Sequence, residues 1–223
     1  MAGQKSTYHH GNLRQAMLDA ASAILADEGL QALTLRACAR RAGVSHAAPA
    51  HHFGGLKGLL TAVVAQSFDM IAAVAEKAYQ TAPKTPESQI SEFARQYAKF
   101  AVHNPERFRL MFRRDLVDIH DPILEQAERR AYAIFTRMVY LVRGEPARDF
   151  EEFRAGKLPK AVYQDVLLLW STVHGFTHLF IEQQLTGYDE ILGSDADKFI
   201  DEVWDDLAGP MLAGLSTRFK PHN

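Results

Sequence analysis

Cysteine is almost absent from this 223-residue chain, and so are long apolar runs. The single cysteine, Cys38, excludes an internal disulfide and a zinc site built from several cysteines. Its place among small apolar residues indicates simple core packing. No apolar run approaches the roughly 18 residues that span a bilayer, and the N-terminus lacks the apolar stretch of a signal peptide. We therefore expect a cytoplasmic protein without a membrane partner.

Strand patterns are missing as well. Apolar and polar residues do not alternate over any sustained stretch, and β-branched residues are scattered. Apolar residues recur at helical spacing instead, with Asn12, Thr34 and Ser45 as expected helix caps and Gly29 and Gly43 as expected stops. The sequence predicts an all-α fold of about nine helices. Their ranges are 13–28, 34–41, 46–53, 56–79, 86–102, 105–112, 122–143, 160–186 and 195–215.

A strong net charge is also missing, because 25 basic residues face 27 acidic ones and the formal net charge is −2. Within residues 1–60, however, six basic residues oppose three acidic ones, which leaves about +3 there and about −5 in the remainder. Positive charge confined to one small segment is what contact with nucleic-acid phosphates requires. Five histidines in this segment add to the charge when they are protonated.

The segment LTLRACARRAGVSHAAPAHHF (33–53) has the form of a helix-turn-helix, in which the second helix enters the DNA major groove. Ala39 stands where the two helices cross, so a larger side chain would force them apart. Gly43 occupies the turn, where a positive φ is required. Val44 is expected to fill the apolar gap beneath the turn, while Leu35 and Cys38 face the preceding helix. These features predict a compact unit of three short helices.

Residues 10–64 resemble the DNA-binding domain of the TetR family of regulators. The matching positions are Leu35, Ala39, Gly43, Val44, Ser45, His51, His52, Phe53, Lys57 and Leu60. The resemblance implies that Phe53 pins the recognition helix to the core and that Lys57 meets a phosphate beside the positive end of the fourth helix. The DNA-binding residues that we predict are Thr34, Arg36, Ser45, His46, Ala47, Ala48, Ala50, His51, His52 and Lys57.

Two residues of the predicted recognition helix depart from the family pattern. Pro49 replaces the usual aliphatic residue, at the limit of the first turn, where proline is tolerated. Ala50 replaces the usual tyrosine, whose hydroxyl commonly reaches a phosphate. The loss of one phosphate contact should weaken binding. An alternative therefore stays open, namely a helical small-molecule-binding protein on the same fold that has lost DNA binding.

Residues 167–185 (LLLWSTVHGFTHLFIEQQL) place Trp170, His174, His178 and Glu182 at intervals of four, on one helix face. Three interpretations compete: buried side chains with satisfied N–H groups, the wall of an effector pocket, or a metal site. From 174 to 182 the helix rises about 12 Å, so one ion reaches at most two of its three ligands. We predict no metal site and no cofactor.

The WxxxHG motif at 170–175 also resembles the WHG type of TetR C-terminal domain, and NPERFRLMF at 104–112 supports this resemblance. It implies a helical domain that binds a ligand and dimerises. The effector-pocket residues that we predict are Tyr97, Phe100, Phe108, Met111, Phe112, Phe135, Met138, Trp170, His174 and His178. The dimer-interface residues that we predict are Phe176, Leu179, Phe180, Gln183, Phe199, Val203, Trp204, Leu207 and Met211, with internal packing of these stripes as the alternative.

The expected organisation is a helix-turn-helix DNA-binding domain at 1–58 and a helical effector-binding and dimerisation domain at 59–223. The expected function is that of a homodimeric transcriptional regulator, a repressor that a small-molecule effector releases from a pseudo-palindromic double-stranded DNA operator. No nucleophile and base occur in a recognisable motif, and no glycine-rich phosphate loop is present. We therefore do not expect an enzyme.

Overall fold

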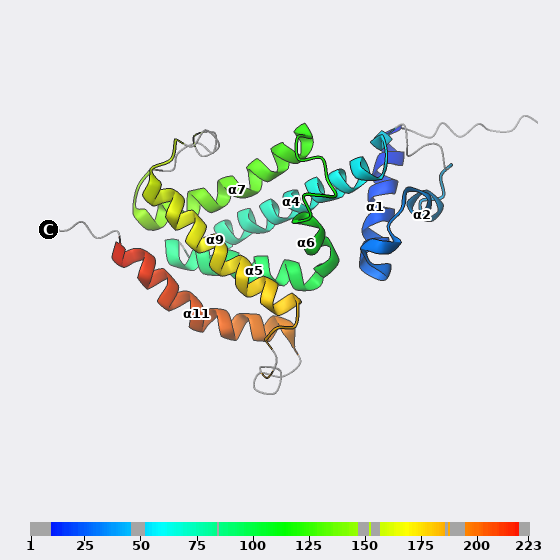
Figure 1. The fold of residues 1–223 in the computed structure, drawn as a ribbon. Coiled ribbons are helices and arrows are strands. Elements are labelled where there is room, and N and C mark those ends of the chain that lie inside the picture. The colour runs from blue at the N-terminus through cyan, green and yellow to red at the C-terminus, as the bar shows by residue number, and fades with distance from the viewer. Residues whose placement is uncertain are drawn as a thin grey trace, which may run out of the picture. The chain divides into compact units, whose positions relative to one another are not determined.

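In the computed structural model, the described residues are 10–45, 52–83, 85–146, 152, 157–185, 187 and 195–218, and their regular elements are all helices. The α-helices are α1 (His10–Glu28), α2 (Leu35–Arg41), α4 (Leu56–Thr81), α5 (Pro86–His103), α6 (Pro105–Met111), α7 (Pro122–Arg143), α9 (Lys160–Ile181) and α11 (Ala196–Arg218), and a 3-10 helix, η1 (Leu30–Ala32), follows α1 (Figure 1). The all-α prediction is confirmed. Residues 46–51 of the predicted third helix lie outside the described residues.

Several helix ends follow from local backbone chemistry. Gly29, with φ of 80°, follows α1 as predicted. The prediction that Asn12 caps α1 is wrong, because the backbone is already helical from His10. The helix α9 ends at Ile181, five residues before the predicted end. Gln183 there adopts φ of 54°, and the N–H of Gln184 donates to the Leu179 carbonyl at 2.9 Å, so the chain closes in a Schellman turn.

The chain forms two compact units. The first contains residues 1–67 and 104–126, and the second contains residues 68–103 and 127–223. In the first unit, α1 packs against η1, α2 and α6. Its buried face carries Met17, Ala21, Ile24 and Leu25, which recur at helical spacing and are at most 2% exposed. Burial of each large apolar side chain contributes about 1.5–3 kcal/mol to folding.

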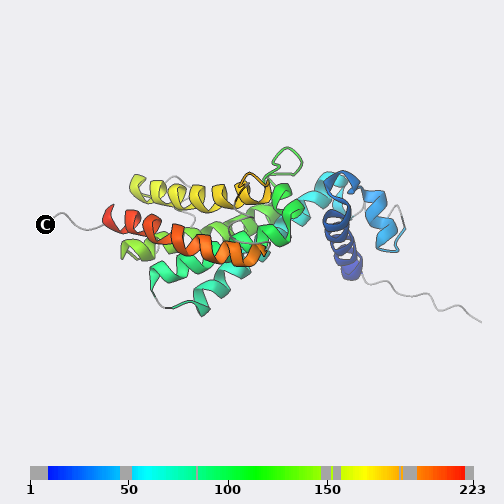
Figure 2. The same cartoon turned by 90° about the horizontal axis from the view of Figure 1, so that it is seen from below.

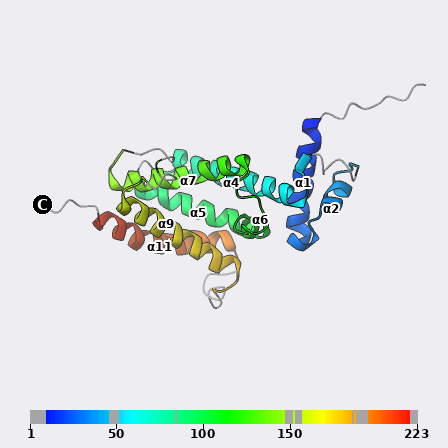
Figure 3. The same ribbon diagram turned by 45° about the horizontal axis from the view of Figure 1, so that its top comes forward.

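In the second unit, α5 packs against both α9 and α11. Figures 2 and 3 show α9 and α11 side by side along one side of this unit, with α5 next to them. Ala98 of α5 and Phe199 and Ile200 of α11 form a buried cluster here, and side chains of α9 pack onto it. Because this contact joins helices that lie a hundred residues apart in the sequence, it fixes the unit's core.

One described helix, α4, is long and apolar enough to cross a membrane by length and composition alone. This corrects the prediction that no apolar run approaches that length. Within the structure, 56% of the apolar window of α4 is buried. A core helix passes the same test, and this burial is the behaviour of a core helix.

Candidate functional site

The turn after α2 has the geometry that the sequence predicts. Thr34 caps α2, because its Oγ1 accepts a hydrogen bond from the Ala37 N–H at 3.1 Å. Ala39 is fully buried within the helix. Gly43 has φ of 67°, and the Val44 N–H then donates to the Ala39 carbonyl at 3.0 Å. This is a Schellman turn, which redirects the chain at the point where a helix-turn-helix needs it.

Gly43 serves this turn through its backbone alone. A Cβ added at this position would meet no described residue within 4 Å, so among the described residues it is the positive φ that requires glycine. Val44 is half-buried beneath the turn, Leu35 is half-buried on α2, and Cys38 is fully buried. The predicted positive φ of Gly43 is therefore confirmed, and Ala39 is buried as its predicted role requires, although residues 46–51 of the helix that it is expected to cross lie outside the described residues.

The arginines of α2 divide into two groups. Arg41 forms ion pairs with Asp27 and, at 3.2 Å, with Glu28 at the end of α1, so its charge holds the two helices together. Arg36 and Arg40 are exposed, and no ion pair joins either of them to a described residue. The exposed positive charge of α2 is therefore carried by Arg36 and Arg40.

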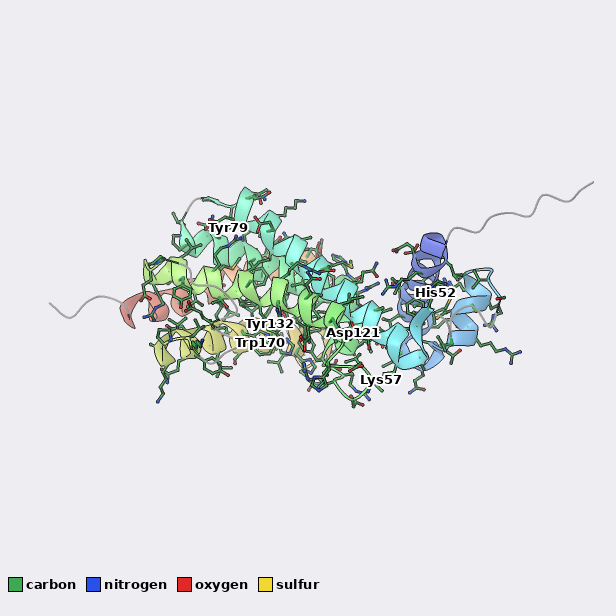
Figure 4. All side chains as sticks on the ribbon, turned by 90° about the horizontal axis from the view of Figure 1, so that it is seen from above. His52, Lys57, Tyr79, Asp121, Tyr132 and Trp170 are labelled. Atoms are coloured by element: carbon green, nitrogen blue, oxygen red, sulfur yellow. The ribbon has the colours of Figure 1, made fainter. Side chains whose placement is uncertain are left out.

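The other predicted DNA-binding residues are only partly described. Thr34 and Ser45 are exposed, His52 is half-buried and Lys57 is exposed in the first turn of α4. Figure 4 labels His52 and Lys57 in the first unit. The predicted contacts in the recognition helix lie outside the described residues; they are His46, Ala47, Ala48, Ala50 and His51. Pro49, the predicted departure from the family pattern, lies outside them as well.

The start of α4 is joined to α1 through Phe53. The Arg14 guanidinium of α1 lies 5.5 Å from the centre of the Phe53 ring, which is cation–π distance. Gly58 faces the Phe53 backbone, where an added Cβ would lie 1.9 Å from the carbonyl oxygen. Only glycine permits this approach. Sequence reasoning missed Gly58, although a glycine inside an otherwise apolar helix start was a visible sign of close packing.

In the second unit, the predicted face of α9 carries a run of aromatic contacts. The ring of Trp170 lies 5.9 Å from that of His174, and His174 stacks on His178 at 5.9 Å. Tyr132 of α7 meets Trp170 edge to face at 5.6 Å, and the two are labelled next to each other in Figure 4. Tyr97 of α5 places its hydroxyl 3.1 Å from His174 Nδ1, within hydrogen-bonding distance. Sequence reasoning missed Tyr132.

Burial sets the charge state of this cluster. Tyr97 is 3% exposed, and burial raises the pKa of its phenol, with the nearby Tyr132 as a second cause. Burial also lowers the pKa of His174, and the neighbouring His178 adds to the effect. Both groups are therefore neutral at pH 7, so this pair offers hydrogen bonds and aromatic surfaces without a fixed charge.

The remaining predicted pocket residues fall into both units. Phe100, Phe135 and Met138 are buried in the second unit, and Phe135 contacts Tyr97 edge to face. Phe108, Met111 and Phe112 belong to the first unit, where the Phe108 and Phe112 rings lie 5.2 Å apart. The predicted pocket residues are therefore divided between the two units. Among the described residues, no three His, Cys, Asp or Glu side chains converge as metal ligands.

The predicted dimer stripes are partly used inside the subunit. Phe199 and Trp204 are buried, and Phe176, Phe180 and Val203 pack on the cluster between α5 and α11. Leu179, Gln183 and Leu207 are exposed, while the side chain of Met211 lies outside the described residues. The outer face of α9 additionally exposes Tyr163, Leu167 and Leu168, which sequence reasoning did not select.

Comparison with known proteins places both units in one family. The family model described as bacterial regulatory proteins, tetR family, matches residues 17–63. The model described as tetracyclin repressor-like, C-terminal domain, matches residues 90–207, which is more than half of the chain. No curated protein sequence matches the chain significantly.

Solved structures agree with this fold. A protein of unknown function from Rhodococcus sp. RHA1 is 28% identical, with a TM-score of 0.72 over 95% of this chain and 100% of that one. A TetR family transcription regulator from Marinobacter aquaeolei VT8 is 18% identical, with a TM-score of 0.57 over 92% and 95%. A regulatory protein of the tetR family from Rhodococcus RHA1 is 17% identical, with a TM-score of 0.60 over 91% and 96%.

Proposed function

This chain belongs to the TetR family of DNA-binding transcription regulators, and we propose that it acts as a homodimeric repressor which a small-molecule effector releases from a pseudo-palindromic operator. The observation that carries the proposal is the turn after α2, where Thr34 caps the helix, Ala39 is fully buried and Gly43 has the positive φ of a helix-turn-helix. We assign no catalytic step to the protein.

The proposed DNA contacts combine positioning and readout. Lys57 is exposed in the first turn of the 26-residue helix α4, where the helix dipole adds to its positive charge. We propose that Lys57 binds a phosphate and that Arg36 and Thr34 add contacts to the DNA backbone from α2. Base readout falls to the segment from Ser45 to His52, as the family resemblance implies.

The proposed effector site is the aromatic cluster of the second unit. Its members come from α5, α7 and α9, and its hydrogen-bonded pair, Tyr97 and His174, is neutral at pH 7. A site of this kind favours an uncharged, flat ligand that exchanges hydrogen bonds with Tyr97, Trp170 or His174. We propose that the helices have two arrangements, of which one fits the operator and the other does not. A ligand that binds more tightly to the second arrangement releases the protein from the operator.

The proposed dimer surface is the outer face of α9. Tyr163 and Leu167 lie about one turn apart, and both they and Leu179, further along the helix, are at least 46% exposed. Ser171 and Gly175 lie between Leu167 and Leu179, and their small side chains allow another helix to approach closely. We propose that a second copy of the chain covers this face, as a two-fold symmetric assembly requires.

We further propose a cytoplasmic location, because a bacterial regulator must reach genomic DNA.

Selection from a pool of random double-stranded DNA tests the DNA-binding part of the proposal. The purified chain should enrich an inverted repeat whose half-sites lie about one helical turn apart, since each recognition helix of a dimer reads one half-site. Enrichment of no sequence, with binding that is equally weak for every DNA, would instead support a helical ligand-binding protein that has lost DNA binding.

The dimer surface is tested separately. Leu167→Glu should convert the dimer to a monomer in sedimentation equilibrium, because the new charge would be buried without a partner. The control is Ile123→Glu on α7, which changes another exposed apolar side chain, 53% exposed. An Ile123→Glu protein that dissociates equally, or a Leu167→Glu protein that remains dimeric, would contradict the assignment of this face.

A further inference from the structure

Arg107 of α6 is a buried cation that no described carboxylate pairs with. The residue is 9% exposed. Its Nη2 donates to Ser22 Oγ of α1 at 2.5 Å, and its Nη1 donates to Ser67 Oγ of α4 at 3.0 Å. A longer contact of 3.5 Å joins Nη1 to Gln66 Oε1, also on α4. One guanidinium therefore joins three helices of the first unit.

Both serine hydroxyls are oriented to accept. Ser22 Oγ donates its proton to the Leu18 carbonyl at 2.8 Å, and Ser67 Oγ donates its proton to the Val63 carbonyl at 2.7 Å. Each hydroxyl proton is thus committed to the helix that carries it, and the oxygen lone pairs remain for Arg107. The planar fork of arginine reaches both hydroxyls at once, which the single ammonium group of lysine cannot do.

The energetic character of this link is unusual for a buried charge. Burial lowers the pKa of the Arg107 guanidinium, and no acidic group offsets that effect. Bonds to neutral hydroxyls compensate the lost hydration less fully than a carboxylate does. A link of this kind fixes direction and register, but it adds little to the stability of the unit.

The position of α6 in the chain gives the link its functional meaning. Residues 90–207 match the C-terminal domain of the family, and this range includes α6. By its contacts, however, α6 belongs to the first unit, together with α1 and α2. A single residue, Asn104, separates α6 from α5, which carries Tyr97 of the proposed effector cluster. The C-terminal family domain thus contributes one helix to the unit that holds the helix-turn segment.

We infer that Arg107 is a positioning residue for DNA binding: by bonding Ser22 and Ser67 together, it sets α1 and α4 in the arrangement that fits the operator. The inference rests on the proposed function. It assigns to the C-terminal family domain a defined contact through which that domain controls operator affinity. Arg107 itself contacts no DNA in this account.

Arg107→Met tests the inference, since methionine replaces the apolar stem and removes the guanidinium. We expect the operator Kd to rise about tenfold, equivalent to about 1.4 kcal/mol, while the thermal midpoint stays within a few degrees because an uncompensated buried charge is lost. Ser22→Ala should raise the Kd roughly threefold through the loss of one bond. In combination, Arg107→Met with Ser22→Ala should bind no more weakly than Arg107→Met alone.

Arg113→Met is the matched control, because Arg113 is exposed and pairs with Asp115 within its own loop at 2.8 Å. It should leave the Kd unchanged. An unchanged operator Kd in Arg107→Met overturns the inference. So does a Kd that rises only when the thermal midpoint of the variant also falls strongly. A double variant whose Kd rises by the product of the two single-variant factors overturns it as well. If Arg107→Met does not fold, Ser22→Ala and Ser67→Ala decide, each by a raised Kd measured at a temperature where circular dichroism shows the variant to be fully folded. A wild-type chain that binds no DNA contradicts the proposed function instead.

Discussion

The two units hold a buried arginine in different ways. In the second unit, Arg143 Nη1 donates to Asp165 Oδ2 at 2.7 Å, and the two side chains are 12% and 4% exposed. In the first unit, the described partners of Arg107 are hydroxyl and amide groups. A buried ion pair is costly to break, because each partner is left as an unpaired charge. The Arg143–Asp165 ion pair should therefore stabilise the second unit. Loss of the Arg107 hydrogen bonds in the first unit should instead alter function more than stability.

The largest effect should come from breaking the ion pair of the second unit. Asp165→Ala removes the buried acidic partner of Arg143, whereas another partner, Glu145, is 43% exposed. We expect a loss of about 3 kcal/mol in the free energy of unfolding, measured by urea denaturation. The control is Asp115→Ala, which removes a partner that is 60% exposed and should not change stability measurably. If Asp165→Ala lowered the free energy of unfolding as little as Asp115→Ala does, the proposed difference between the two units would be contradicted.

Overpacking the helix crossing should have the next largest effect, in the first unit. Ala39 is 0% exposed, so Ala39→Leu has no space and should cost about 2 kcal/mol. Arg40→Leu introduces the same side chain at the adjacent exposed position of α2 and should be close to neutral in urea denaturation. Equal stability of the two leucine variants would show that the helices do not meet at Ala39.

Removal of the α2 cap should cost less. Thr34→Ala deletes the oxygen that accepts the Ala37 N–H, and we expect a loss of about 1 kcal/mol. Thr34→Ser keeps the oxygen and should retain most of the stability. Chemical denaturation of the two variants distinguishes the hydrogen bond from the loss of side-chain volume, and a serine variant as unstable as the alanine variant argues against the cap.

The smallest effect should be a pH dependence that belongs to the second unit. Because burial lowers the pKa of His174 in the folded chain from 6.5, the unfolded chain binds protons first as the pH falls. The stability that depends on neutral His174 is thus fully present above pH 6.5 and is lost as the pH falls through the folded pKa. His174→Gln should flatten the urea-denaturation profile between pH 7 and pH 5. A profile unchanged by this substitution contradicts the assignment to His174.

Local sequence patterns predicted much of the first unit and most helix ranges. The Thr34 cap and the positive φ of Gly43 depend on residues within one turn of each other, so a short segment contains all the information needed. The same holds for the intervals of four that place Trp170, His174 and His178 on one face of α9. Contacts set within a single helix are therefore readable from sequence.

Contacts between distant segments could not be read in this way. Arg107 has no charged partner in its surroundings, so no charge pattern marked it, and its acceptors lie 85 and 40 residues away. The stripe of α11 resembled a dimer surface, yet Trp204 and Phe199 pack inside the subunit because Phe176 and Phe180 of α9 lie opposite them. Which apolar faces meet within one subunit depends on topology, and periodicity alone does not specify it.

The salt dependence of operator binding tests the central claim, that this chain reads DNA through its first unit. Fluorescence anisotropy with the DNA enriched from the random pool should show a Kd that rises steeply with salt. Lys57→Ala should reduce the magnitude of the log–log salt slope by about 0.9, since one phosphate contact is lost. Lys77→Ala, which removes an exposed lysine further along the same helix, should leave the slope unchanged. Binding that is independent of salt, or identical slopes for the two variants, would contradict the claim.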